Sequence, residues 1–270
     1  MTALQAEYGD RDVALSGEIL RTVVGSGVHG IAIEGTDDHD ELGVYVEPPE
    51  HVIGLHAPAS HYVWRTQPEG ARSGPGDTDL VMYSLRRYLR LATVGNPTVL
   101  LPLYAPEDAV LVCRPLGRQL RALAPALLSQ QAVHRFLGYM NGQRDRLLGR
   151  GRRSDMPNRP ELVARYGYDV KYASHALRLA YQGWEIVRDG RLTLPMPEPE
   201  RERVLRVKRG EVRDLAAVLA EIEQVQATVQ DHLDTGRTPL PAHPDLAAIS
   251  AWAVDAHREF WGWTAGLTPR

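Results

Sequence analysis

The chain has 270 residues, of which 43% are hydrophobic and 24% are charged, so it is long enough to bury the core of one or two globular domains. It has no run of 18 apolar residues and no basic-then-apolar leader, and we therefore expect a soluble cytoplasmic protein with no membrane partner. The chain has a single cysteine, Cys113, which excludes an internal disulfide and a cysteine-based zinc site; the apolar run around it predicts a buried thiol. The formal net charge of −3 excludes a global attraction to nucleic acid.

The first part of the chain has the pattern of short strands joined by turns. Apolar and β-branched runs predict strands at 19–24, 40–46, 62–64 and 79–83. A short helix is expected within residues 1–18, and a small strand or loop at 51–55. Two glycines in Gly25-Ser26-Gly27 would let backbone amides at the end of the first strand approach an anion closely.

Acidic residues stand at the start of two of these strands. Asp38 and Asp40 are two residues apart, so strand alternation points both carboxylates to one face, and Asp79 opens the strand at 79–83, with Asp77 as its competitor. Neighbouring carboxylates repel each other unless a divalent cation lies between them. Beside the Gly25-Ser26 turn, three such carboxylates could hold two magnesium ions; the alternative is an acidic surface turn and an exposed strand end.

The rest of the chain reads as helices. Ser84 is expected to cap a helix at 85–92, which Gly95-Asn96-Pro97 ends. Further helices are predicted at 98–103, 116–128, 131–148, 160–182, 212–233 and 244–261. Asp189-Gly190 is a strong turn signal and predicts a small hairpin or extended arm at 184–194.

Basic residues gather at three places in this helical part. Lys171, His175 and Arg178 follow i, i+4, i+7 spacing and would form one polar stripe suited to a triphosphate or an RNA backbone, or else a solvated helix face. The block from Arg144 to Arg153 is a candidate polyanion patch, or else a solvated helix end and loop. The mixed-sign cluster at 202–211 favours a surface held by ion pairs over a phosphate-binding role. His29 lies near the glycine-serine turn and could contact a phosphate or a base.

Several of these stretches together resemble the DNA polymerase β-like nucleotidyltransferase superfamily, and within it the predicted nucleotidyltransferases associated with bacterial RNA repair. The resemblance is carried by Gly25-Ser26, Asp38-x-Asp40-x-x-Gly43-Val44, Asp79, the stretch from Tyr83 to Pro97, and Tyr166-Gly167-Tyr168-Asp169-x-Lys171-x-x-x-His175. It implies an α+β fold: a polymerase β-like nucleotidyltransferase domain with a mixed β-sheet and flanking helices (1–108), followed by a mostly helical domain that binds the nucleotide or the acceptor (109–270).

The same resemblance implies roles for individual residues. Gly25 and Ser26 would bind the triphosphate, and Asp38, Asp40 and Asp79 would hold two Mg²⁺ ions, although Asp37 stands where the family commonly has serine and its charge could alter metal affinity. The expected reaction transfers a nucleoside monophosphate from an NTP to a hydroxyl and releases pyrophosphate. An RNA 3′ end is the favoured acceptor. A hydroxyl of a small molecule or a protein is the second hypothesis, and a non-catalytic nucleotide-binding regulator is the third.

Overall fold

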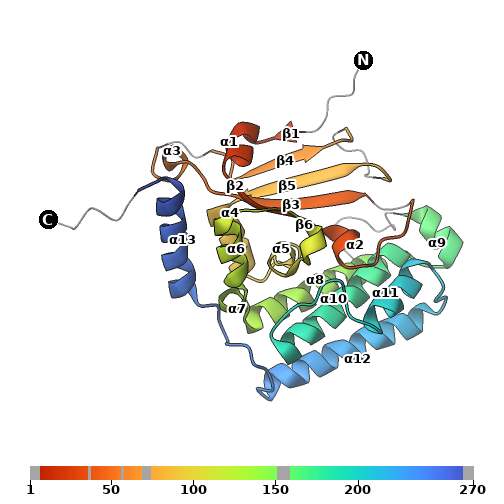
Figure 1. The fold of residues 1–270 in the computed structure, drawn as a ribbon. Helices are drawn as coiled ribbons and strands as arrows, with labels where there is room; N and C mark the ends of the chain where they lie inside the picture. Colours follow the sequence, from red (N-terminus) through yellow and green to blue (C-terminus); the bar gives the residue numbers. More distant parts are fainter. Residues whose placement is uncertain (1–6, 36–37, 56–57, 69–73, 151–158, 264–270) are drawn as a thin grey trace.

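The computed structural model describes residues 7–35, 38–55, 58–68, 74–150 and 159–263. The first half of the chain contains a six-stranded mixed sheet (Figure 1). The strands are β1 (Glu7–Tyr8), β2 (Glu18–Val23), β3 (His39–Tyr45), β4 (His61–Arg65), β5 (Thr78–Ser84) and β6 (Val110–Cys113), in the order β1-β4-β5-β3-β2-β6. The four predicted strands are confirmed. Cys113 lies on the edge strand β6 and is half-buried, so the prediction of a fully buried thiol is wrong.

The parallel pairing of β3 with β5 determines how the site is built. His39 pairs with Thr78 and Asp40 pairs with Asp79, while the other pairs of adjacent strands are antiparallel. Residues that are paired across adjacent strands point to the same face of a sheet. Asp40 and Asp79 are 39 positions apart in the sequence, and they therefore lie on the same face of the sheet, at the end where the central strands β3 and β5 begin.

Short helices surround the sheet: α1 (Arg11–Ser16), α2 (Gly25–Val28), α3 (Pro49–Val52), α4 (Leu85–Thr93) and α5 (Leu101–Tyr104). Ser84 caps α4 as predicted, because its side chain accepts a hydrogen bond from the Arg87 amide. Of the small strand or loop expected at 51–55, the strand is wrong and the loop is limited to residues 53–55. Pro49 begins α3 instead, since the fixed φ of proline suits the first position of a helix, where no hydrogen-bond donor is needed.

The second half of the chain is helical, as predicted. Its helices are α6 (Pro115–Ala122), α7 (Ala124–Leu127), α8 (Gln130–Leu147), α9 (Pro160–Tyr166), α10 (Val170–Asp189), α11 (Glu200–Lys208), α12 (Leu215–Asp234) and α13 (Leu246–Phe260). Helix α10 packs against α8, α11 and α12 and is therefore the central helix of this half (Figure 1). Within the described ranges, no helix has both the length and the apolar composition needed to cross a bilayer.

Two predictions about α10 were inexact or wrong. The helix expected at 160–182 is two helices, because Gly167, with a φ of 88°, ends α9 and the Asp169 side chain caps α10. The hairpin or extended arm expected at 184–194 does not begin at 184: α10 continues to Asp189, Gly190 ends it in the left-handed conformation, and only residues 191–194 lie outside the helix without forming a hairpin. Residues from the second half also return to the sheet, through β6 and through the bond from Trp261 Nε1 to the Glu47 carbonyl, so the division of the chain at residue 108 stays a prediction.

Candidate active site

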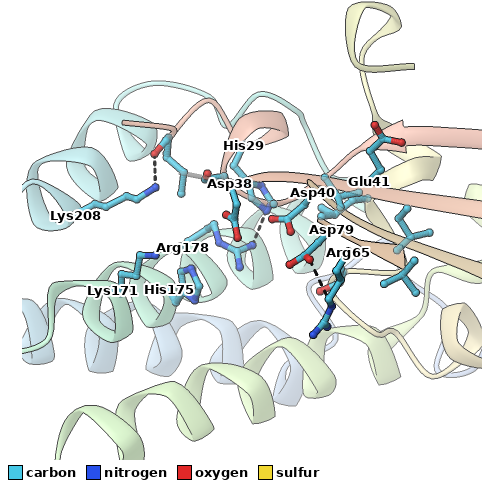
Figure 2. Close-up of a pocket in the computed structure, with 18 of the residues that line it drawn as sticks. His29, Asp38, Asp40, Glu41, Arg65, Asp79, Lys171, His175, Arg178 and Lys208 are labelled. Carbon is cyan, nitrogen blue, oxygen red and sulfur yellow. Dashed lines mark hydrogen bonds and ion pairs between the residues drawn. The ribbon is translucent and has the colours of Figure 1, made fainter. Parts of the chain in front are cut away.

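Three aspartates converge at the edge of the sheet where β3 and β5 begin. Asp38, Asp40 and Asp79 each offer a carboxylate oxygen, and these oxygens all lie within 4.8 Å of one another (Figure 2). All three side chains are half-buried. Clustered carboxylate oxygens of this kind are ligands that Mg²⁺ prefers, so the residues present fit a divalent metal.

The glycine-serine turn lies directly against one of these carboxylates. The Val24 amide donates to the Asp40 carbonyl at 2.9 Å, and α2 then begins at Gly25, whose φ is +66°. A Cβ at position 25 would overlap Asp40 Oδ2. Only glycine therefore combines this backbone conformation with a carboxylate so close, and Ser26 follows it at the cavity wall.

Asp79 is held by two residues that sequence analysis did not single out. Gln67 Nε2 donates to Asp79 Oδ1 at 2.8 Å, and Arg65 Nε lies 3.4 Å from the same oxygen. Gln67 is only 5% exposed although it belongs to a long polar connection. The apolar run before Arg65 was the sequence signal that could have identified Arg65, because it predicts the strand β4, and β4 pairs Arg65 with Asp79.

Asp77 has a different role from Asp79. Its carboxylate accepts hydrogen bonds from Thr66 Oγ1 and from the Gly74 amide, both at 2.9 Å. These bonds hold the turn that precedes β5. Asp77 is not part of the described three-aspartate cluster, which contains Asp79.

The polar stripe of α10 faces the aspartates from across a cavity (Figure 2). Arg178 NH1 donates to His29 Nε2 and to Gln182 Oε1, each at 2.8 Å. Burial lowers the pKa of Arg178 to about 10, so the guanidinium stays charged at neutral pH. Burial and the adjacent Arg178 hold the pKa of His29 well below its usual value, and because arginine can only donate, the neutral ring accepts through Nε2.

His175 lies between the cations of the stripe. Its ring is accessible from the cavity, yet the surrounding protein and then the charges of Arg178, Lys208 and Lys171 lower its pKa. His175 is therefore neutral at pH 7. Of the three stripe residues, Lys171 and Arg178 supply the positive charge and His175 supplies a neutral ring.

Lys208 and Arg159 complete the cationic wall. Sequence analysis did not single out Arg159, and it favoured ion pairs over a phosphate role for the cluster that contains Lys208. Lys208 is 8% exposed and donates from Nζ to the Ile31 carbonyl at 2.8 Å, although it belongs to the cluster predicted to be an ion-paired surface. That prediction holds for its neighbours, since Arg206 lies 3.5 Å from Glu211. Arg159 contacts Asp169 at 3.3 Å and lies over the Tyr172 ring.

All nine predicted site residues line one open cavity of about 420 Å³. They are Gly25, Ser26, His29, Asp38, Asp40, Asp79, Lys171, His175 and Arg178. One wall is acidic and the opposite wall carries Lys171, Arg178, Lys208 and Arg159, an arrangement that suits a polyphosphate bound between cations and metal ions. Asp37, Arg152 and Arg153 lie outside the described residues.

Comparison with known proteins identifies the family. A family model described as the RNA repair pathway DNA polymerase beta family matches residues 12–248. Among solved structures, a nucleotidyltransferase-like protein from Exiguobacterium sibiricum matches at 10% sequence identity, covering 92% of this chain and 76% of that chain with a TM-score of 0.30. No curated protein sequence matches. Since the family model spans the aspartates, the glycine-serine turn and the α10 stripe, the chain belongs to the RNA repair pathway DNA polymerase beta family and is a nucleotidyltransferase.

Proposed function

We propose that this nucleotidyltransferase transfers a nucleoside monophosphate from an NTP to the 3′ hydroxyl of an RNA strand in a magnesium-dependent reaction. The observation that carries the proposal is the cavity itself, in which three carboxylates face a wall of lysine and arginine side chains. A triphosphate needs both: cations for its own charge, and carboxylates for the metal ions that accompany it. The family description supports RNA as the acceptor.

Asp38, Asp40 and Asp79 would hold Mg²⁺, which when bound would neutralise charge on the phosphates and lower the pKa of the attacking hydroxyl. The Gly25-Ser26 turn, Lys171, Arg178 and Lys208 would bind the triphosphate. The acceptor hydroxyl oxygen forms a bond to the α-phosphorus, the bond to the bridging oxygen breaks, and pyrophosphate leaves with that electron pair. Asp79 would receive the hydroxyl proton, oriented by its bonds to Gln67 and Arg65.

The two histidines would contribute as neutral groups. A neutral His29 leaves Arg178 as the only cation of that pair and fixes its direction through the 2.8 Å bond. A neutral His175 can donate one hydrogen bond to a phosphate or a base without adding charge. We also propose the division of labour between residues 1–108, which supply the carboxylates and the turn, and residues 109–270, which supply the cationic wall.

The decisive experiment is transfer of label from each α-³²P-labelled NTP to RNA in the presence of Mg²⁺. RNA with a free 3′ hydroxyl is compared with the same RNA carrying a 3′ phosphate, which removes the nucleophile. We expect label only on the free 3′ end. Label on the protein or on a small molecule of a cell extract would show a different acceptor, and NTP binding without any labelled product would show a regulator.

The matched variants replace aspartates inside the cavity and, as a control, an aspartate on the surface far from it. Asp38→Ala with Asp40→Ala should abolish transfer while the protein stays folded by circular dichroism. Asp255→Ala, on the exposed surface of α13, should transfer as well as wild type. Transfer by the double variant at the wild-type rate would refute the proposed mechanism.

A further inference from the structure

We propose that single-stranded RNA approaches the aspartates along the open face of β1, β4 and β5, with its bases stacked on a row of aromatic rings and its phosphates on arginines at the far end. This proposal rests on the proposed function, because it names the surface that binds the acceptor. It deepens that function by identifying residues outside the nucleotide cavity.

An aromatic row crosses these three strands. The rings of Tyr8 and His61 have centroids 4.9 Å apart, and those of His61 and Tyr83 are 6.1 Å apart. Tyr8 is 54% exposed, while His61 and Tyr83 are half-buried. Exposed rings on a sheet are platforms on which nucleic-acid bases stack, and stacking tolerates any base sequence.

The row is continuous with the active site. His61 pairs with Tyr83 and Arg65 pairs with Asp79, so alternation places Asp79, Val81 and Tyr83 on the same face as the rings. All three of these β5 residues line the nucleotide cavity. From Asp79 to the end of β5 the strand spans about 17 Å, which is room for a few nucleotides that end at the carboxylates.

Arginines occupy the far end of this path. Arg87 lies 5.6 Å above the Tyr83 ring and donates to Ser60 Oγ at 3.2 Å, and its buried Nε has no hydrogen-bond partner among the described residues. Together with Arg86, Arg90 and Ser60 it lines a second cavity of about 460 Å³. In the part of the chain that the structure describes, no carboxylate pairs with any of these three arginines.

The charge of this second cavity favours an anion. Its lining carboxylate, Glu47, is 7% exposed and is engaged with His257 Nε2 at 3.3 Å. Three arginines lie beside the row of aromatic rings, and strand β5 joins this row to Asp79. The arrangement matches a polymer that carries both aromatic bases and phosphates. A small acceptor would need only the nucleotide cavity, so single-stranded RNA is the partner that uses the whole surface.

The test is fluorescence anisotropy of a labelled single-stranded RNA with a free 3′ hydroxyl, measured without NTP over a range of salt concentrations. The double variant Tyr8→Leu with Arg87→Gln is compared with a double variant of the same kinds of residue on α13, Phe260→Leu with Arg258→Gln, whose side chains are exposed away from the proposed surface. We expect the first to lose at least tenfold in affinity and to reduce the slope of log K against log salt by about 0.7. The α13 variant should bind within twofold of wild type.

The proposal is wrong if the two double variants bind RNA equally well, or if the wild-type protein binds no RNA. Should Tyr8→Leu with Arg87→Gln fail to fold, crosslinking of wild-type protein to RNA with 4-thiouridine near its 3′ end decides instead: crosslinks within 61–87 support the surface, and crosslinks only elsewhere overturn it. The two proposals can fail separately. RNA that binds at this surface but is never labelled refutes the transfer reaction, and RNA labelled with unchanged KM by the double variant refutes the surface.

Discussion

Replacing Gly25 by alanine should reduce the activity far more than its modest effect on the stability of the fold would explain. A Cβ at this position would overlap Asp40 Oδ2 and lie 3.0 Å from its Cγ, whereas ordinary contacts begin at 3.4 Å. The carboxylate must therefore move by on the order of 1 Å, a misplacement that can cost about 10²-fold in rate, or roughly 2.7 kcal/mol of transition-state stabilisation. We expect kcat/KM for the labelled NTP and the affinity for Mn²⁺ both to fall.

The matched control is Gly236→Ala. Gly236 has a φ of +67°, against +66° for Gly25, but nothing lies within 4 Å of the point that its Cβ would occupy. Both variants should therefore lose the same roughly 1–2 kcal/mol of stability from the left-handed backbone, measured by urea unfolding. Only Gly25→Ala should lose activity and metal affinity. Equal activities of the two variants would show that the turn does not position Asp40.

Three further predictions concern stability. Because His29 is held neutral, the unfolded state binds more protons than the folded state below the ordinary histidine pKa of 6.5, so the melting temperature should fall from pH 7.5 to 5.5. His29→Gln should reduce this dependence of the melting temperature on pH, and an unchanged dependence would contradict a neutral buried ring. Tyr88→Phe should raise the free energy of unfolding by about 1 kcal/mol in urea titration, since the Tyr88 hydroxyl is buried without a partner among the described residues. A lower free energy of unfolding would show that the hydroxyl makes a hydrogen bond in the folded protein. Gly95→Ala should lower that free energy by about 3 kcal/mol, because its Cβ would overlap the Ala132 backbone, whereas loss of activity with normal stability would point to a catalytic role.

Local patterns predicted much of the fold. The strands around Asp40 and Asp79 were predictable because alternation and β-branched residues act within a few positions. The α10 stripe was predictable because Lys171, His175 and Arg178 follow the helical period. Convergence of the aspartates also needs the parallel β3–β5 register, which the sequence alone does not specify.

Residues positioned by tertiary packing were not predicted as site residues. Lys208 enters the cavity only because α11 lies against the loop that carries Ile31, and nothing near Lys208 in the sequence distinguishes it from the charged residues around it. The hairpin predicted at Asp189-Gly190 was wrong for a related reason, because this dipeptide is common both in hairpin turns and at the ends of helices. Burial of Ile186 and Val187 selects the helix, and burial is a property of the folded chain.

The backbone ladder between β3 and β5 sets the positions of Asp40 and Asp79 relative to each other independently of the length of the chain between residues 48 and 60. Insertions or deletions between residues 48 and 60 should therefore be tolerated far better than the loss of a single residue inside either strand, which would turn the following side chains to the opposite face. Variants of this chain that are longer or shorter between residues 48 and 60 should accordingly still present the same carboxylates to a nucleotide.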